Sequence, residues 1–131
     1  MNDNARKWVE ALRSGEYKQG REQLRKGDRY CCLGVACDTL REEVGGKWRA
    51  VDEGFVFETP ETPEMFHEVA FLPEAVQNLL GLRSLSGSYH VDPADGSINM
   101  GSLTQMNDYA RASFEEIADV IESEPEGLFV S

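Results

Sequence analysis

The three cysteines of this 131-residue chain lie close together, at Cys31, Cys32 and Cys37. They follow Arg29 and open a segment whose apolar spacing predicts a helix. A thiol at the start of a helix faces unbonded backbone amides and the positive end of the helix dipole, which lower its pKa and favour the nucleophilic thiolate. Catalysis also needs a base, and His90 is the better of the two histidines for that role. One hypothesis is therefore a cysteine-dependent hydrolase that uses Cys31 or Cys32 with His90.

A structural role for the thiols is the interpretation that the pattern favours. Helical periodicity places Cys32 and Cys37 on faces shared with Leu33, Ala36 and Leu40, and buried cysteine is a common small core residue. The sequence contains no Walker loop and no nucleophile-elbow motif, and it lacks an oxyanion-hole signature. The cysteine spacing is not that of a zinc site. We therefore predict no metal and no cofactor, and the sequence favours a protein that is not an enzyme.

The segment before the cysteines is the only basic cluster in the sequence. Its cations are Lys18, Arg21, Arg25, Lys26 and Arg29. Aromatic side chains next to cationic donors can stack on an anionic ligand and pair with its charge. The residues predicted to bind such a ligand are Tyr17, Gln19, Arg21, Arg29 and Tyr30. The competing interpretation is an ordinary solvated surface.

Charge is distributed unevenly along the chain, whose net charge is −11. Residues 1–50 carry 11 Lys/Arg and 8 Asp/Glu, whereas residues 51–131 carry 2 Lys/Arg and 16 Asp/Glu. Such an acidic second half repels nucleic acid and membrane surfaces and favours a basic partner. It also allows a second hypothesis, in which the carboxylates mimic nucleic acid and block a DNA-binding host protein.

The composition is that of a folded intracellular protein. Hydrophobic residues make up 40% and charged residues 28% of the chain. No apolar run approaches the roughly 18 residues of a membrane span, and the first residues contain no apolar signal-peptide core. An odd number of cysteines, two of them adjacent, argues against a disulfide framework. We expect a cytoplasmic protein with reduced thiols.

Local patterns predict the elements that must position these side chains. Helices are expected over 4–13, 31–43, 73–80 and 102–108 and after a capping box at Ser113, and strands over 16–28 around a Lys26-Gly27-Asp28 turn, 47–51, 55–57, 66–71, 88–91, 97–100 and 128–130. The mixture predicts an α+β fold, a single compact domain over residues 1–131 with three or four helices around a small antiparallel sheet.

Five sequence blocks, spread over most of the chain, carry a family resemblance. They are Trp8-x2-Ala11-Leu12-x-Ser14-Gly15-x-Tyr17-x-Gln19, Tyr30-Cys-Cys-Leu-Gly-Val35-x-Cys37-Asp38, Leu72-Pro73 through Leu80-Gly81-Leu82, Asn107-Asp108, and Phe114-x-Glu116-Ile-Ala-Asp119-x-Ile121-Glu122. In these blocks the chain resembles a group of small uncharacterised proteins of tailed bacteriophages and prophages. The resemblance implies a phage-type accessory protein in a bacterial cytoplasm, and it supplies no catalytic residue. The group has no histidine at position 90, which weakens the hydrolase hypothesis.

The first functional hypothesis is therefore a non-enzymatic binding protein. It would sequester a small anionic ligand or inhibit a host protein, such as a component of host defence. A homo-oligomer is compatible with the sequence, whereas membrane binding and direct nucleic-acid binding are not expected.

Overall fold

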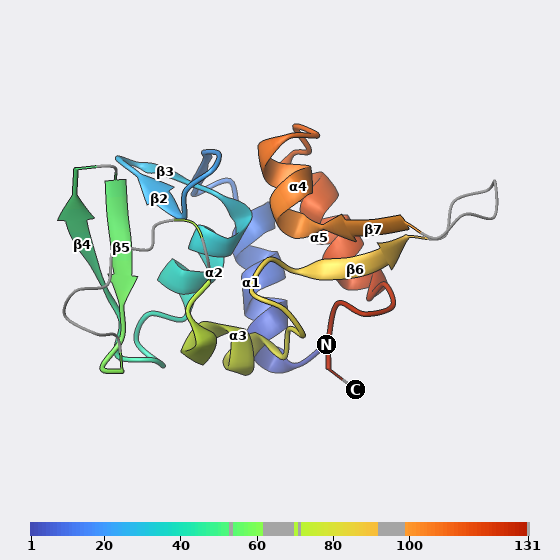
Figure 1. The fold of residues 1–131 in the computed structure, drawn as a ribbon, viewed down its shortest axis with the longest axis horizontal. Coiled ribbons are helices and arrows are strands. Elements are labelled where there is room, and N and C mark those ends of the chain that lie inside the picture. Colours follow the sequence, from blue (N-terminus) through green and yellow to red (C-terminus); the bar gives the residue numbers. More distant parts are fainter. Residues whose placement is uncertain (53, 62–69, 71, 92–98, 131) are drawn as a thin grey trace.

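The computed structural model describes residues 1–52, 54–61, 70, 72–91 and 99–130. Five helices and seven strands occur among these residues (Figure 1). They are α1 (Asp3–Arg13), β1 (Lys18–Gln19), β2 (Arg25–Lys26), β3 (Arg29–Tyr30), α2 (Cys32–Thr39), β4 (Lys47–Val51), β5 (Gly54–Glu58), α3 (Glu74–Leu80), β6 (Ser88–Val91), β7 (Asn99–Ser102), α4 (Leu103–Asp108) and α5 (Phe114–Ser123). The fold is α+β, as the sequence predicted.

The strands form three small sheets instead of one. β1, β3 and β2 make the first, in which β1 pairs in parallel with β3 and β2 pairs antiparallel to it. β4–β5 and β6–β7 are separate antiparallel hairpins. Hairpins need only the chain on either side of one turn to form, so short strands close locally without joining a common sheet. In Figure 1 the β4–β5 and β6–β7 hairpins lie at opposite ends of the molecule, with α1 and α2 between them.

Helix α1 packs through the apolar stripe that its sequence predicts. Ala5, Trp8, Val9 and Leu12 are buried, and α1 contacts α2, α3 and α5. Asn2 caps the helix, because its Oδ1 accepts a hydrogen bond of 2.8 Å from the amide of Ala5. Trp8 is fully buried, and its indole N–H donates a hydrogen bond to the buried carbonyl of Cys32 in helix α2.

Helix α2 lies at the centre of the core but is shorter than predicted. It runs over Cys32–Thr39 instead of 31–43, and the residues after Leu40 form exposed turns that end at Gly45, whose φ is +63°. The polar side chains of 41–43 have no core to face, so the last predicted turn gains nothing from packing. Gly34 allows a close approach, since a Cβ there would lie 1.8 Å from the carbonyl oxygen of Leu24.

Most other predicted boundaries are confirmed. Gly27 has a φ of +61° between β2 and β3, Gly81 has a left-handed C-cap conformation after α3, and Ser113 and Glu116 form both hydrogen bonds of the capping box. The predicted final strand is reduced to one antiparallel bridge between Leu82 and Phe129. The predicted strand over 66–71 and the first two residues of the predicted strand over 97–100 lie outside the described residues, apart from residue 70.

Within the described part of the chain, no helix has the length and apolar character needed to cross a membrane. Two connections define the upper edge of the molecule in Figure 1: the segment between α1 and α2, and the turn between α4 and α5. The candidate site is built on the first of these.

Candidate functional site

An aromatic cluster joins the segment before α2 to the β4–β5 hairpin. The rings of Tyr17 and Tyr30 meet edge to face with centroids 5.1 Å apart, and Tyr30 meets Trp48 in the same way at 5.9 Å. Trp48 also contacts Phe55 at 6.4 Å and Phe57 at 4.9 Å. In the hairpin Trp48 pairs with Phe57, and Ala50 with Phe55, so the three rings project from one face. These contacts hold the rings in place before any partner arrives.

Arg25 of β2 lies against these rings. Its guanidinium carbon is 4.1 Å from the ring centroid of Phe55, 5.3 Å from that of Tyr30 and 5.6 Å from that of Trp48. Each distance is within the range of a cation–π interaction. Its Nε also donates to the carbonyl of Gly27 at 2.9 Å. We call Tyr17, Arg25, Tyr30, Trp48 and Phe55 the aromatic–arginine cluster.

Asp38 on α2 anchors the cluster through its carboxylate. It accepts hydrogen bonds from the Tyr17 hydroxyl at 2.8 Å and from the Trp48 indole N–H at 3.0 Å, and it pairs with Arg41 at 3.2 Å. Burial, together with the hydrogen bond to Asp38, raises the pKa of Tyr17 to about 12. Burial is also the main cause of the raised pKa of Tyr30. Both phenols therefore stay neutral at physiological pH and present ring surfaces, and the Tyr17 hydroxyl also donates to Asp38.

The five residues predicted to bind a ligand do not form one pocket. Tyr17 and Tyr30 touch, and both are only partly buried. Arg21 and Arg29 are exposed, and Arg29 donates to the carbonyl of Gln19 at 3.3 Å. The Gln19 side-chain amide is bonded inside the protein, so its assignment to a ligand is not supported.

Gln19 belongs instead to a buried polar network around Asn107, which is fully buried. The Oδ1 of Asn107 accepts from Gln19 Nε2 at 2.8 Å and from the amide of Cys32 at 3.2 Å, and its Nδ2 donates to the carbonyl of Gly20 at 2.8 Å. Gln19 Nε2 also donates to the carbonyl of Ala112 at 2.8 Å. We call Gln19, Gly20, Cys32, Asn107 and Ala112 the polar network, and it ties β1, α2 and α4 together.

Comparison with known proteins gives a family without a function. A family model described as Domain of unknown function (DUF8296) matches residues 1–125. The chain belongs to this family. No curated protein matches it, and no solved structure matches it.

Sequence reasoning missed the parts of the DUF8296 chain that complete the site. Trp48 lies opposite Phe57, and Phe55 lies opposite Ala50, two positions further along the hairpin. Arg25 follows Leu24, whose side chain is buried. Hairpin register could have placed both rings on one face. Nothing local could have shown that Arg25 packs on that face, because β2 and β5 meet only through the tertiary fold.

The thiols are core residues, which contradicts the hydrolase hypothesis. Cys32 and Cys37 have no exposed surface and Cys31 is 6% exposed. Burial raises the pKa of Cys31 to about 12 and raises the pKa of the other two thiols well above the ordinary value. The Sγ of Cys31 caps α2 by accepting from the amide of Gly34 at 3.4 Å. Desolvation therefore outweighs the helix dipole and keeps the thiols protonated.

His90 does not supply a base to these sulfurs. It is exposed on β6, and its backbone amide donates to the carbonyl of Glu126 at 2.7 Å. The Sγ of Cys32 instead lies 3.6 Å from the carbonyl oxygen of Leu103. No group of three or more potential metal ligands occurs in the described ranges. His67 lies outside those ranges.

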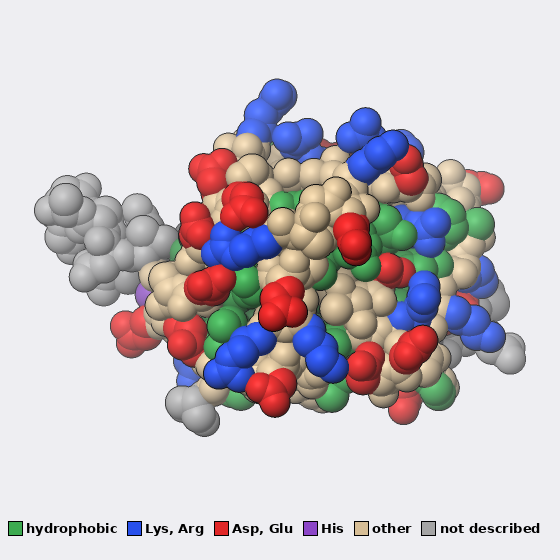
Figure 2. Space-filling model, turned by 180° about the vertical axis from the view of Figure 1, so that it is seen from behind, with side chains coloured by type: hydrophobic (Ala, Val, Ile, Leu, Met, Phe, Trp, Pro, Cys, Tyr) green, Lys and Arg blue, Asp and Glu red, His purple; other side chains and the backbone are tan. Residues whose placement is uncertain are grey.

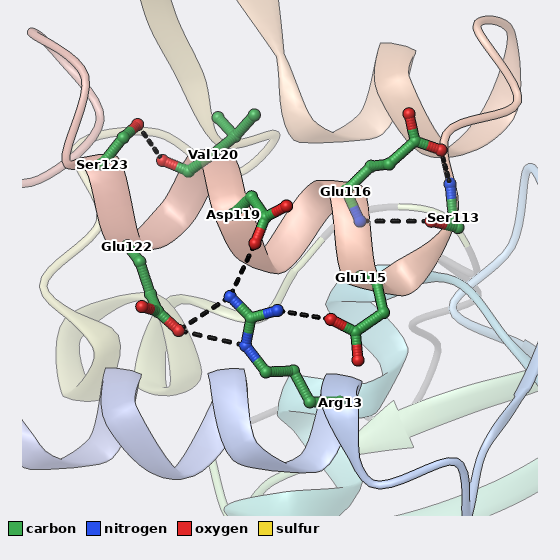
Figure 3. Close-up of polar contacts among 8 residues, drawn as sticks. All are labelled: Arg13, Ser113, Glu115, Glu116, Asp119, Val120, Glu122 and Ser123. Carbon is green, nitrogen blue, oxygen red and sulfur yellow. Dashed lines mark hydrogen bonds and ion pairs between the residues drawn. The ribbon is translucent and has the colours of Figure 1, made fainter.

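The carboxylates of α5 are arranged around one cation. Glu115, Asp119 and Glu122 all bond the guanidinium of Arg13 on α1 (Figure 3). Figure 2 shows acidic and basic side chains interspersed over the face that it presents. A nucleic-acid mimic needs rows of free carboxylates with phosphate-like spacing, and α5 does not provide such a row.

Proposed function

We propose that this DUF8296 protein is a non-enzymatic, phage-type accessory protein that inhibits a host protein in the bacterial cytoplasm. The aromatic–arginine cluster is the centre of the contact surface. The observation that carries the proposal is the packing of Arg25 between three rings, each partly accessible to solvent. Tyrosine, tryptophan and arginine dominate the affinity of protein interfaces.

The cluster suits a protein partner because it is held in place by its own contacts. Edge-to-face packing and the hydrogen bonds to Asp38 restrict the rotamers of Tyr17 and Trp48. Side chains that are already ordered lose less entropy on binding, which increases the affinity available from a given contact area. The rings and their aliphatic neighbours supply the apolar centre, and exposed cations such as Lys26 supply a polar rim.

A small anionic ligand is the weaker alternative. Such a ligand needs several donors that converge on one point. Here the Gln19 amide is bonded to Asn107 and Ala112, and Arg25 faces ring surfaces. The donors that remain, Arg21 and Arg29, lie at the exposed edge of the segment.

The test is affinity capture from bacterial lysate followed by native mass spectrometry. We expect the wild-type protein to retain one host protein in a fixed ratio. Arg25→Ala and Tyr30→Ala should each weaken retention by about tenfold or more, because they remove central contacts. Val130→Ser is the control, since Val130 is 60% exposed and its backbone amide bonds the carbonyl of Gly81 at the end of α3, outside the aromatic–arginine cluster.

Thermal melting of each variant separates lost binding from lost folding. Equal retention by wild type and both cluster variants would contradict the proposal, as would recovery of the protein without any host protein. A small anion retained by wild type and released by the cluster variants would instead support the alternative.

A further inference from the structure

A second contact surface lies on the upper edge of the molecule, where two loops meet. The first loop contains Arg21, and the second, between α4 and α5, contains Tyr109 and Arg111. Tyr109 is 72% exposed, more than the other large apolar side chains in the described ranges. We call these three residues the basic edge. In Figure 2, Lys and Arg side chains project along the upper outline of the molecule.

Hydrogen bonds between the two loops bring these residues together. Gly20 accepts from the side chain of Asn107 at 2.8 Å, and the amide of Glu22 donates to the Oδ1 of Asp108 at 2.9 Å. Arg21 therefore sits between two residues that are bonded to the end of α4. Tyr109 follows Asp108 directly, and Arg111 precedes Ala112, which accepts from Gln19 at 2.8 Å.

Both loops contain backbone strain beside the exposed cations. Glu22 has a φ of +70° and Arg111 a φ of +56°, and Glu124 is the other described non-glycine residue with a positive φ. Glycine adopts this conformation without the steric conflict that a Cβ introduces. Strained residues of this kind cluster at functional sites, where the side chain has a role that outweighs the strain. Arg111 is held where glycine would fit more easily.

Among the described residues, the charges of the basic edge have no protein partner. No hydrogen bond or ion pair involves the side chain of Arg21 or Arg111 in the part of the chain that the structure describes. Lys18, by contrast, pairs with Asp28 at 2.8 Å. Two guanidinium groups on loops that are hydrogen-bonded to each other, with an exposed phenol on one of these loops, offer bidentate donors for carboxylates and a ring for an apolar side chain.

We infer that the basic edge binds a short acidic segment of a protein partner. Nucleic acid fits less well, because its closely spaced phosphates would meet Glu16, Glu22 and the overall charge of −11. A protein segment with a few carboxylates can pair with both arginines and avoid the neighbouring acids. The inference rests on the proposed function, in that it gives the chemistry of part of the partner.

An NMR titration of the full chain with an octaglutamate peptide tests this inference without a host protein. We expect saturable shifts of the backbone signals of Arg21, Tyr109 and Arg111. Arg111→Glu should weaken binding by about tenfold or more. Arg83→Glu is the matched control: Arg83 is exposed and is the other cation of residues 51–131, so it changes the net charge equally. Its binding should stay within about twofold of wild type.

Two further measurements separate recognition from structure and from nonspecific charge. Arg111→Gly should bind as weakly as Arg111→Glu while its melting temperature stays at or above that of wild type, because the left-handed backbone is kept. A lower melting temperature for Arg111→Gly would show that the side chain supports the loop and would overturn the inference. So would equal shifts with sodium chloride of matched ionic strength, or tighter binding of an eight-residue thymidine oligonucleotide. Failure of the host-protein capture would leave the peptide result intact, so the two proposals can fail separately.

Discussion

The polar network and the basic edge lie next to each other in the sequence and on the same pair of loops, yet their polar groups have opposite fates. Asn107 is fully buried and each of its side-chain polar atoms is bonded. Tyr109, two residues later, is 72% exposed. A buried, hydrogen-bonded residue such as Asn107 can hold a loop in place, whereas an exposed residue such as Tyr109 is accessible to a partner. The difference shows that the polar side chains of this network serve the fold, and it supports the proposal that a partner is bound at the exposed basic edge.

The largest expected effect on stability comes from disrupting the buried polar network. Asn107→Leu removes the partner of the Cys32 amide and of the Gly20 carbonyl. Each buried group left without a hydrogen bond costs about 1–3 kcal/mol, so we expect the free energy of unfolding in urea to fall by about 2–6 kcal/mol. The same change at Asn78, which is exposed on α3, should alter stability by less than about 0.5 kcal/mol. Equal effects at the two positions would contradict the structural role of the network.

The sequence predicted the elements that depend on neighbouring residues, but not the contacts between distant segments. The helix over α1, the two hairpins and the capping box of α5 are encoded by neighbouring residues, and their patterns predicted them. The polar network is not local, because 88 positions separate Gln19 from Asn107. A glutamine beside tyrosine and arginine therefore resembled a ligand donor, although its partner is inside the fold. The length of α2 also depended on tertiary packing, which ends at Leu40.

The ionisation of the thiols gives a second, smaller test of burial. Because the pKa of Cys31 in the folded state is about 12, against 9.0 without the fold, its stabilisation is complete below pH 9 and is lost as the pH rises toward 12. Each such thiol should lower the free energy of unfolding by about 1 kcal/mol between pH 9 and 10. Urea unfolding at both pH values measures this slope, and Cys37→Ala should show a slope smaller by one thiol. An unchanged slope would mean that Cys37 ionises as readily in the folded protein as in the unfolded chain.

The smallest effect on stability is expected for substitutions in the exposed basic edge. An unchanged free energy of unfolding is the predicted result there. Tyr109→Ser removes a ring with little buried area, so the free energy of unfolding should stay within about 0.5 kcal/mol of wild type. Tyr17→Phe removes a hydroxyl that is bonded to Asp38 and should lower it by about 1 kcal/mol. Urea unfolding of both variants measures the two changes in the free energy of unfolding under the same conditions.

Binding should rank the same two variants in the reverse order. Octaglutamate affinity should fall in Tyr109→Ser, because the exposed phenol is two residues from Arg111 on the same loop of the basic edge. It should be unchanged in Tyr17→Phe, whose ring surface remains. If Tyr109→Ser destabilised the fold and left peptide binding intact, Tyr109 would belong with Asn107 among the residues that hold the loops together. The comparison of Tyr17, which is bonded to Asp38, with the exposed Tyr109 thus distinguishes a tyrosine that stabilises the fold from one that is available to contact a partner.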